Sequence, residues 1–122
     1  MDWQKELNKI RFFDKPRRSS SKESNSVYFG WNRQKDKTTA LQYLPPNSKT
    51  SKHFHKKLEE EYHVLAGKCT VLKGNKQIKL TKKLRIRKKE PHQLKTGKEG
   101  CLMLLEIIHK NRPSWQKDKI TL

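Results

Sequence analysis

The chain has 122 residues, enough for one domain with a modest core. Its 30 Lys and Arg outweigh its 12 Asp and Glu, and the formal net charge of +18 favours anionic partners such as nucleic acid, acidic lipid or phosphorylated small molecules. No apolar run approaches the roughly 20 residues that span a bilayer, and the polar first residues are unlike a secretory signal. The two cysteines lie too far apart in the sequence for a zinc ribbon. We therefore expect a cytoplasmic protein with reduced thiols.

The first segment, residues 1–13, has the pattern of a short helix. Its apolar residues Trp3, Leu7 and Ile10 are spaced three and four apart, as on one helical face, and Asp2 can cap the helix. Residues 14–26 are rich in Ser and charge and contain a Pro, which is typical of a mobile loop or linker. We therefore divide the chain into a helix with a linker over 1–25 and a folded domain over 26–122.

From Val27 onward, short apolar segments recur between Gly, Pro, Asn and Lys residues. Several alternate apolar and basic residues with a period of two, most clearly over 77–80 and 83–87, as in strands with one buried and one solvated face. No helical period interrupts them. The pattern predicts an all-β sandwich or barrel, with strands in the segments SVYFGW, TTALQYL, EYHVLAG, KCTVLKG, NKQIKL, KLRIRK and CLMLLEII.

One stretch carries candidate metal ligands. His53 and His55 are two residues apart, so their rings project from the same face of an extended strand, and Glu60 follows shortly after. Two imidazoles and a carboxylate form a mixed nitrogen and oxygen site that suits Zn, Fe, Mn, Ni or Co without selecting among them. A fourth ligand would leave one or two positions for water or substrate. The alternative is that the two histidines lie on a lysine-rich surface and bind no metal.

This stretch resembles the first motif of the cupin superfamily. In that motif a His-x-His pair is followed by a Glu and then by a Gly, and here these residues are His53, His55, Glu60 and Gly67. Asn47 stands where the family often has Gly.

The second cupin motif places another His on a later strand, usually just after a Pro, and Pro91-His92 stands in that position. The resemblance covers roughly residues 38–108. It implies a double-stranded β-helix, which is a jelly-roll barrel, with a divalent metal ion deep in its mouth. The ligands that it implies are His53, His55, Glu60 and His92.

A closer likeness is to the cupin domain of type II mannose-6-phosphate isomerases. The isomerases usually carry Gln where His53 stands, so this chain is nearer the general cupin pattern. The resemblance implies aldose–ketose isomerisation of a sugar phosphate. The likeness to these isomerases rests on the segments 51–55, 91–92 and 104–107, on Glu60, and on the tail 114–120.

The neighbours of these ligands have competing interpretations. Glu59 and Glu61 flank Glu60 and should face away from it in an extended segment. His63 is expected outside the site, with a catalytic role as the alternative. Glu106 lies on the last long strand and either faces the interior, as a base or hydrogen-bond acceptor, or points to solvent.

Residues 79–98 contain nine basic residues and a single acid, Glu90. The run fits a solvated strand face that discourages edge pairing, or a site near the barrel mouth that captures a phosphate group. No aromatic residues are interleaved among these lysines, as a stacking surface for single-stranded nucleic acid would need.

Three functions fit this sequence. The first is a metal-dependent enzyme that acts on a small anionic metabolite, with sugar-phosphate isomerisation as its most specific form. The second is a module that binds a metal and a ligand without turnover, and the third is a basic protein that associates with nucleic acid. The cupin resemblance also implies a homodimer formed through sheet contacts.

Overall fold

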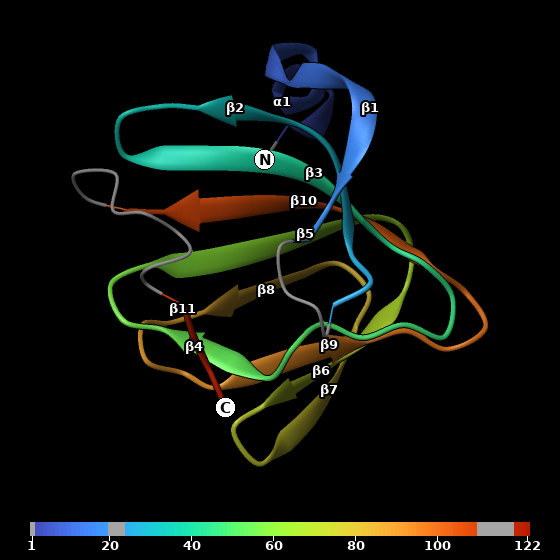
Figure 1. Cartoon of the computed structure of the whole chain (residues 1–122), viewed down its shortest axis with the longest axis vertical. Helices are drawn as coiled ribbons and strands as arrows, with labels where there is room; N and C mark the ends of the chain where they lie inside the picture. The colour runs from blue at the N-terminus through green and yellow to red at the C-terminus, as the bar shows by residue number, and fades with distance from the viewer. Residues whose placement is uncertain (1, 20–23, 110–118) are drawn as a thin grey trace.

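The computed structural model describes residues 2–19, 24–109 and 119–122, and within these ranges it has one helix and eleven strands (Figure 1). The elements are α1 Trp3–Lys9, β1 Arg11–Arg18, β2 Val27–Arg33, β3 Lys37–Leu44, β4 His53–His55, β5 Glu59–Gly67, β6 Cys69–Lys73, β7 Lys76–Leu80, β8 Lys83–Ile86, β9 His92–Lys95, β10 Cys101–Ile108 and β11 Lys119–Thr121.

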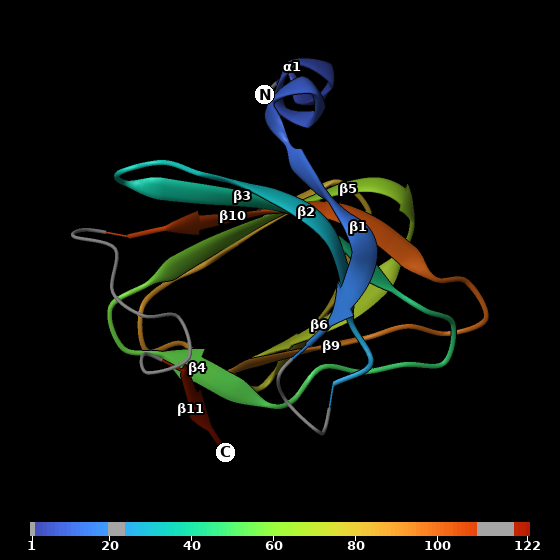
Figure 2. The ribbon, with the colours of Figure 1, turned by 45° about the horizontal axis from the view of Figure 1, so that its top comes forward.

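The strands form two antiparallel sheets that face each other. Sheet A has six strands in the order β1-β2-β3-β10-β5-β8, and sheet B has five in the order β11-β4-β9-β6-β7. The chain crosses between the sheets repeatedly, because β4 and β5, and likewise β8 and β9, lie in different sheets (Figure 2). This arrangement confirms the prediction of a jelly-roll barrel with a short N-terminal helix.

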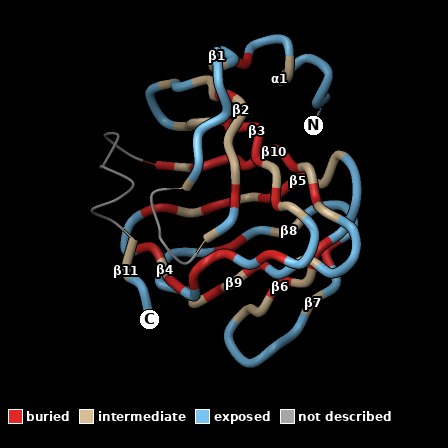
Figure 3. Tube along the Cα trace, turned by 45° about the vertical axis from the view of Figure 1, so that its right-hand side comes forward, coloured by how far each residue is buried: buried red, intermediate tan, exposed pale blue. Residues whose placement is uncertain are grey.

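The main core fills the space between the two sheets. Every second side chain of a strand points inward, so that Val71 of β6, Leu94 of β9, and Met103 and Leu105 of β10 are each at most 2% exposed. Figure 3 shows these buried stretches on the facing strands. Each such side chain contributes about 1.5–3 kcal/mol of burial free energy. The inner faces of β5, β7 and β8 add Tyr62, Leu80 and Ile86.

A smaller hydrophobic cluster lies on the outer face of sheet A. Leu41 of β3 and Leu104 of β10 pair across the sheet and pack with Ile10, which follows α1. Helix α1 begins after Asp2, whose carboxylate accepts a hydrogen bond from the Lys5 N–H, so the predicted cap is confirmed. Within the described ranges no helix has the length and apolar character needed to cross a membrane.

The predicted linker is wrong in its first part, because strand β1 continues through residues 14–18. β1 is an edge strand of sheet A and pairs with β2. Its register shifts between Phe12 and Arg17, so Pro16 lies in an irregularity at a sheet edge, where its missing N–H leaves no ladder bond unmade. Residues 20–23 of the predicted linker lie outside the described residues. The division of the chain into 1–25 and 26–122 stays a prediction.

The turn after β5 supplies a test of the barrel geometry. Gly67 has a φ of 77°, and a Cβ atom placed on it would collide with the Gly100 carbonyl oxygen. We expect Gly67→Ala to lower the free energy of unfolding by about 1–3 kcal/mol, measured by urea denaturation. A Cβ atom placed on Gly97 would meet no atom within 4 Å. Gly97→Ala should therefore change the free energy of unfolding by no more than about 0.5 kcal/mol. Equal effects of the two substitutions would contradict this account.

Candidate metal centre

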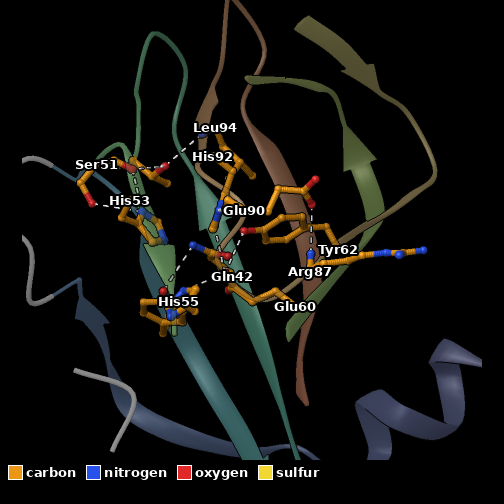
Figure 4. A network of polar contacts seen from close by, with 12 residues as sticks. Gln42, Ser51, His53, His55, Glu60, Tyr62, Arg87, Glu90, His92 and Leu94 are labelled. Carbon is orange, nitrogen blue, oxygen red and sulfur yellow. Dashed lines mark hydrogen bonds and ion pairs between the residues drawn. The ribbon is translucent and has the colours of Figure 1, made fainter. Parts of the chain in front are cut away.

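Three strands bring the four predicted ligands together inside the barrel. His53 and His55 lie on β4 of sheet B, and both are buried while Phe54 between them is not fully so. His53 pairs with His92 on the neighbouring strand β9. Glu60 lies on β5 in the opposite sheet, and Figure 4 shows its side chain extending toward the histidine rings. Residues that are distant in the sequence therefore meet between the two sheets.

The four side chains form a compact, buried group. Each offers one ligand atom, and these atoms all lie within 4.8 Å of one another. The distance from Glu60 Oε1 is 2.9 Å to His55 Nε2 and 3.0 Å to His92 Nε2. The rings of His53 and His92 meet edge to face, with centroids 4.3 Å apart. None of the four residues is more than 7% exposed, so bulk water is largely excluded.

Backbone carbonyl groups set the orientation of two of the rings. His53 Nδ1 donates to the Ser51 carbonyl oxygen at 2.8 Å, and His92 Nδ1 donates to the Glu90 carbonyl oxygen at 2.9 Å. A carbonyl oxygen only accepts, so Nδ1 carries a proton in both rings and Nε2 is the atom left to act as a ligand. Hydrogen bonds of this kind orient the histidine ligands of metal sites.

Burial and mutual contacts shift the pKa values within the group. Burial would raise the pKa of Glu60, but hydrogen bonds from His55 and His92 lower it well below its usual range. Burial also opposes protonation of His92, yet the hydrogen bond to Glu60 raises its pKa. Burial and the nearby His92 lower the pKa of His53 to about 3. The charged Glu60 carboxylate and the neutral His53 ring suit metal binding, and a bound metal ion would take the place of the Nε2 proton that His92 donates to Glu60.

These residues fit a divalent first-row metal. The donors are three imidazole nitrogen atoms and one carboxylate oxygen, and Zn, Fe, Mn, Co and Ni all accept such a set. Four protein ligands leave one or two coordination positions for water or a bound molecule. The buried negative charge of Glu60 also favours cation binding, because a buried carboxylate is stabilised by positive charge close to it.

The other residues considered around these ligands face the opposite side of sheet A. Glu61 pairs in register with Glu106, so the two side chains share the outer face, as predicted for Glu61. His63 pairs with Leu104, which belongs to the outer hydrophobic cluster. The structure therefore does not bring His63 or Glu106 to the metal centre, and a catalytic role for either residue there has no geometric support. Alternation between the inward Leu105 and its neighbours turns Glu106 outward.

Polar contacts join these outer residues to one another and to nearby cations. His63 Nε2 lies 3.1 Å from a Glu61 oxygen and 3.6 Å from a Glu106 oxygen. Lys37 Nζ lies 3.3 Å from Glu106, and two cations of β8 also approach Glu61. The cluster holds enough positive charge to satisfy its two carboxylates, so we assign it a structural role.

The sequence did not predict three polar residues that lie beside the centre, namely Tyr62, Gln42 and Tyr28. The Tyr62 hydroxyl donates to Glu60 at 3.4 Å, and Gln42 Nε2 donates to the Tyr28 hydroxyl at 3.4 Å. Burial and the Glu60 charge raise the pKa of both tyrosines, so their hydroxyl groups stay protonated. One signal was available, because Gln42 interrupts the apolar segment TTALQYL at a position that period-two alternation assigns to the inner face.

No family model matches the sequence, and no curated protein is significantly similar to it. The structure, in contrast, is similar to solved structures. It matches the cupin domain of Cnp3 from Schizosaccharomyces pombe with a TM-score of 0.63 and 12% sequence identity, over 70% of this chain and 65% of that one. The fold is a cupin fold. The predicted cupin-type fold is thus confirmed.

The same cupin fold recurs in structures named for oxalate decarboxylation. A predicted oxalate decarboxylase from Thermotoga maritima matches with a TM-score of 0.68 and 20% identity, over 82% of this chain and 97% of that one. Oxalate decarboxylase from Bacillus subtilis matches with a TM-score of 0.71 and 15% identity, over 94% of this chain and 32% of that one. This chain spans less than two thirds of the Cnp3 domain and about one third of the Bacillus enzyme. At these identities the likeness shows the fold alone.

The more specific likeness to type II mannose-6-phosphate isomerases stays a prediction. Its segments 51–55 and 91–92 contribute histidines to the candidate metal centre. Residues 114–118 of its tail lie outside the described residues.

The opposite orientations of neighbouring glutamates allow a matched test of the centre. We expect Glu60→Gln to weaken Co(II) or Zn(II) binding by about 100-fold or more, because it removes the anionic ligand. Glu59→Gln is the control, since Glu59 pairs with Arg85 on the outside of the barrel and should leave metal affinity unchanged. Isothermal titration calorimetry on both variants measures the difference. Equal metal affinities for the two variants would exclude Glu60 as a ligand.

Proposed function

We propose that this chain is a metal-dependent cupin that binds a small anionic metabolite at one divalent metal ion. His53, His55, Glu60 and His92 would hold the ion. The observation that carries the proposal is the burial of these four side chains with all their ligand atoms within 4.8 Å of one another. Buried groups of this kind are costly unless they are paired, and one metal ion would pair all four.

Charge favours an anionic ligand. A divalent ion beside the single carboxylate of Glu60 keeps a net positive charge, because neutral imidazoles add none. Lys119 of β11 pairs in register with His55 and adds a cation close to the centre. The chain as a whole carries a formal net charge of +18, which attracts anions. Two of the similar structures are named for oxalate, which is itself a small carboxylate.

The metal would supply Lewis acidity, which polarises an oxygen atom of the bound molecule. The chain's own residues would hold the ion and keep water away from it. The Tyr62 hydroxyl donates to Glu60 and keeps that carboxylate oriented toward the histidines. Ile107 pairs in register with Glu60 and Leu105 with Tyr62, and both apolar side chains belong to the buried core beside the centre.

The most specific form of the proposal is aldose–ketose isomerisation of a sugar phosphate. Its support is the motif likeness to type II mannose-6-phosphate isomerases. Such a reaction needs a base that moves a proton between neighbouring carbon atoms. Within strands β3 to β10 the acidic residues are Glu59, Glu60, Glu61 and Glu106, and only Glu60 faces the interior.

The lack of a second interior carboxylate in those strands favours one further candidate, a cupin that binds metal and ligand without turnover. In that case Glu60 is occupied as a metal ligand, and the bound molecule leaves unchanged. Mass spectrometry of a ligand recovered after incubation with the metal-loaded protein distinguishes this candidate from the enzyme.

Elemental analysis tests the metal site itself. We expect the purified protein to carry about one equivalent of a first-row metal, and the double variant His53→Ala/His55→Ala to lose it because two of four ligands are gone. His63→Ala is the control, since it removes a histidine of the outer face. Retention of the metal by the double variant would refute the proposed site.

Turnover tests the more specific proposal. We expect the protein loaded with Mn, Zn, Fe or Co to convert mannose 6-phosphate to fructose 6-phosphate, and the double variant at His53 and His55 to be inactive. The products are measured by a coupled assay for fructose 6-phosphate. Metal uptake without turnover for any of these metals would reject the isomerase and leave the binding module.

Nucleic-acid association, a homodimer and a cytoplasmic location stay predictions. The basic run over 79–98 is largely exposed. Part of it is already paired, because Lys83 contacts Glu61 and Arg85 contacts Glu59 on the outside of sheet A.

A further inference from the structure

Gln42 is a buried polar residue on β3, between the buried apolar residues Ala40 and Leu44. It lies on β3 in register with Tyr28 of β2 and Met103 of β10, on the face of sheet A that looks toward sheet B. Gln42 is only 5% exposed. Its partner Tyr28 packs against the core cluster that contains Tyr62, and the Tyr62 hydroxyl donates to Glu60. Figure 4 shows the Gln42 side chain among those of the centre.

One polar atom of Gln42 has no hydrogen-bond partner among the described residues. Its Nε2 donates to the Tyr28 hydroxyl at 3.4 Å. Its Oε1 is buried and accepts no hydrogen bond from the described part of the chain. Leaving a buried amide oxygen without a donor destabilises a fold, so such atoms are uncommon unless a ligand or a water molecule supplies the donor.

We infer that Gln42 Oε1 accepts a hydrogen bond from a hydroxyl group of the molecule bound at the metal. The inference rests on the proposed function and narrows its substrate class to small α-hydroxy carboxylates and α-hydroxy carbonyl compounds. A molecule of this class offers an oxygen atom to a metal ion and an O–H donor on the adjacent carbon. Gln42 is then the residue that selects for the hydroxyl group.

Water is the competing donor for Gln42 Oε1, and the affinities of two simple probes separate the possibilities. Glycolate and acetate are both small monocarboxylates and differ by one hydroxyl group. If the hydroxyl group of the ligand binds Gln42, removal of the amide weakens the binding of glycolate much more than the binding of acetate. If water binds Gln42, the two probes respond alike.

The experiment uses the full chain loaded with Co(II), whose visible absorption reports ligand binding without any assay of activity. We expect glycolate to bind at least about tenfold tighter than acetate. In Gln42→Met, which has a similar shape and no acceptor, the ratio should fall to about twofold through loss of glycolate affinity. Co(II) affinity should stay the same, because Gln42 is not among the grouped ligand atoms.

Thr39 provides a matched control on the same strand. Its Oγ1 is also buried without a partner in the described residues, but Thr39 pairs with Glu106 and so faces the outside of sheet A. Thr39→Val should keep the full glycolate preference. Gln42→Leu is a second variant that also removes the acceptor, in case Gln42→Met folds poorly.

Each remaining outcome overturns a stated part of the inference. An unchanged ratio in Gln42→Met assigns Oε1 to water. Absence of a response to both probes, with Co(II) bound, rejects the substrate class while leaving the metal centre intact. Failure of the wild-type chain to bind Co(II) rejects the proposed function and this inference with it. Unfolding of both Gln42 variants assigns the residue to the structure instead.

Discussion

The buried carboxylate of Glu60 is the constraint on which the rest of the structure depends. An ionised carboxylate between two apolar sheet faces is stable only beside close cations or hydrogen-bond donors. His55 and His92 supply these from sheet B, at 2.9 and 3.0 Å. The apolar core, which includes Tyr62 of β5 and Leu94 of β9, must therefore hold these two strands in fixed relative positions, and β4 is held by its pairing with β9. The geometry that stabilises the buried charge is also the geometry that can hold a cation.

Most of the barrel could be predicted because strands β2, β3, β5 to β8 and β10 each carry a local signal. Alternation of apolar and polar residues marks 77–80 and 83–86, and both segments lie in strands with one face turned to the core. Strand β1 has no such signal, since nearly all of its residues are exposed. It forms because β2 offers a partner for its backbone, and a pairing between distant segments leaves little trace in local composition.

The ligand set was predictable for a similar reason, and its surroundings were not. His53 and His55 are two apart on one strand, so their common direction follows from strand geometry alone. The side on which Glu106 lies depends on the register between β10 and β5, which contains an irregularity, so spacing left both orientations open. The contact between Gln42 and Tyr28 depends on how β2 and β3 pair, and a single polar residue in an apolar strand does not reveal it.

X-ray absorption spectroscopy of the metal-loaded chain tests the central claim most directly. With Zn(II) or Co(II), we expect a first shell of nitrogen and oxygen at about 2.0–2.2 Å, with the outer-shell scattering of three imidazole rings. A sulfur shell at about 2.3 Å, which would place the ion at Cys69 or Cys101, would contradict the account. So would a first shell of oxygen atoms with no imidazole scattering, because the ion would then lie outside the barrel interior.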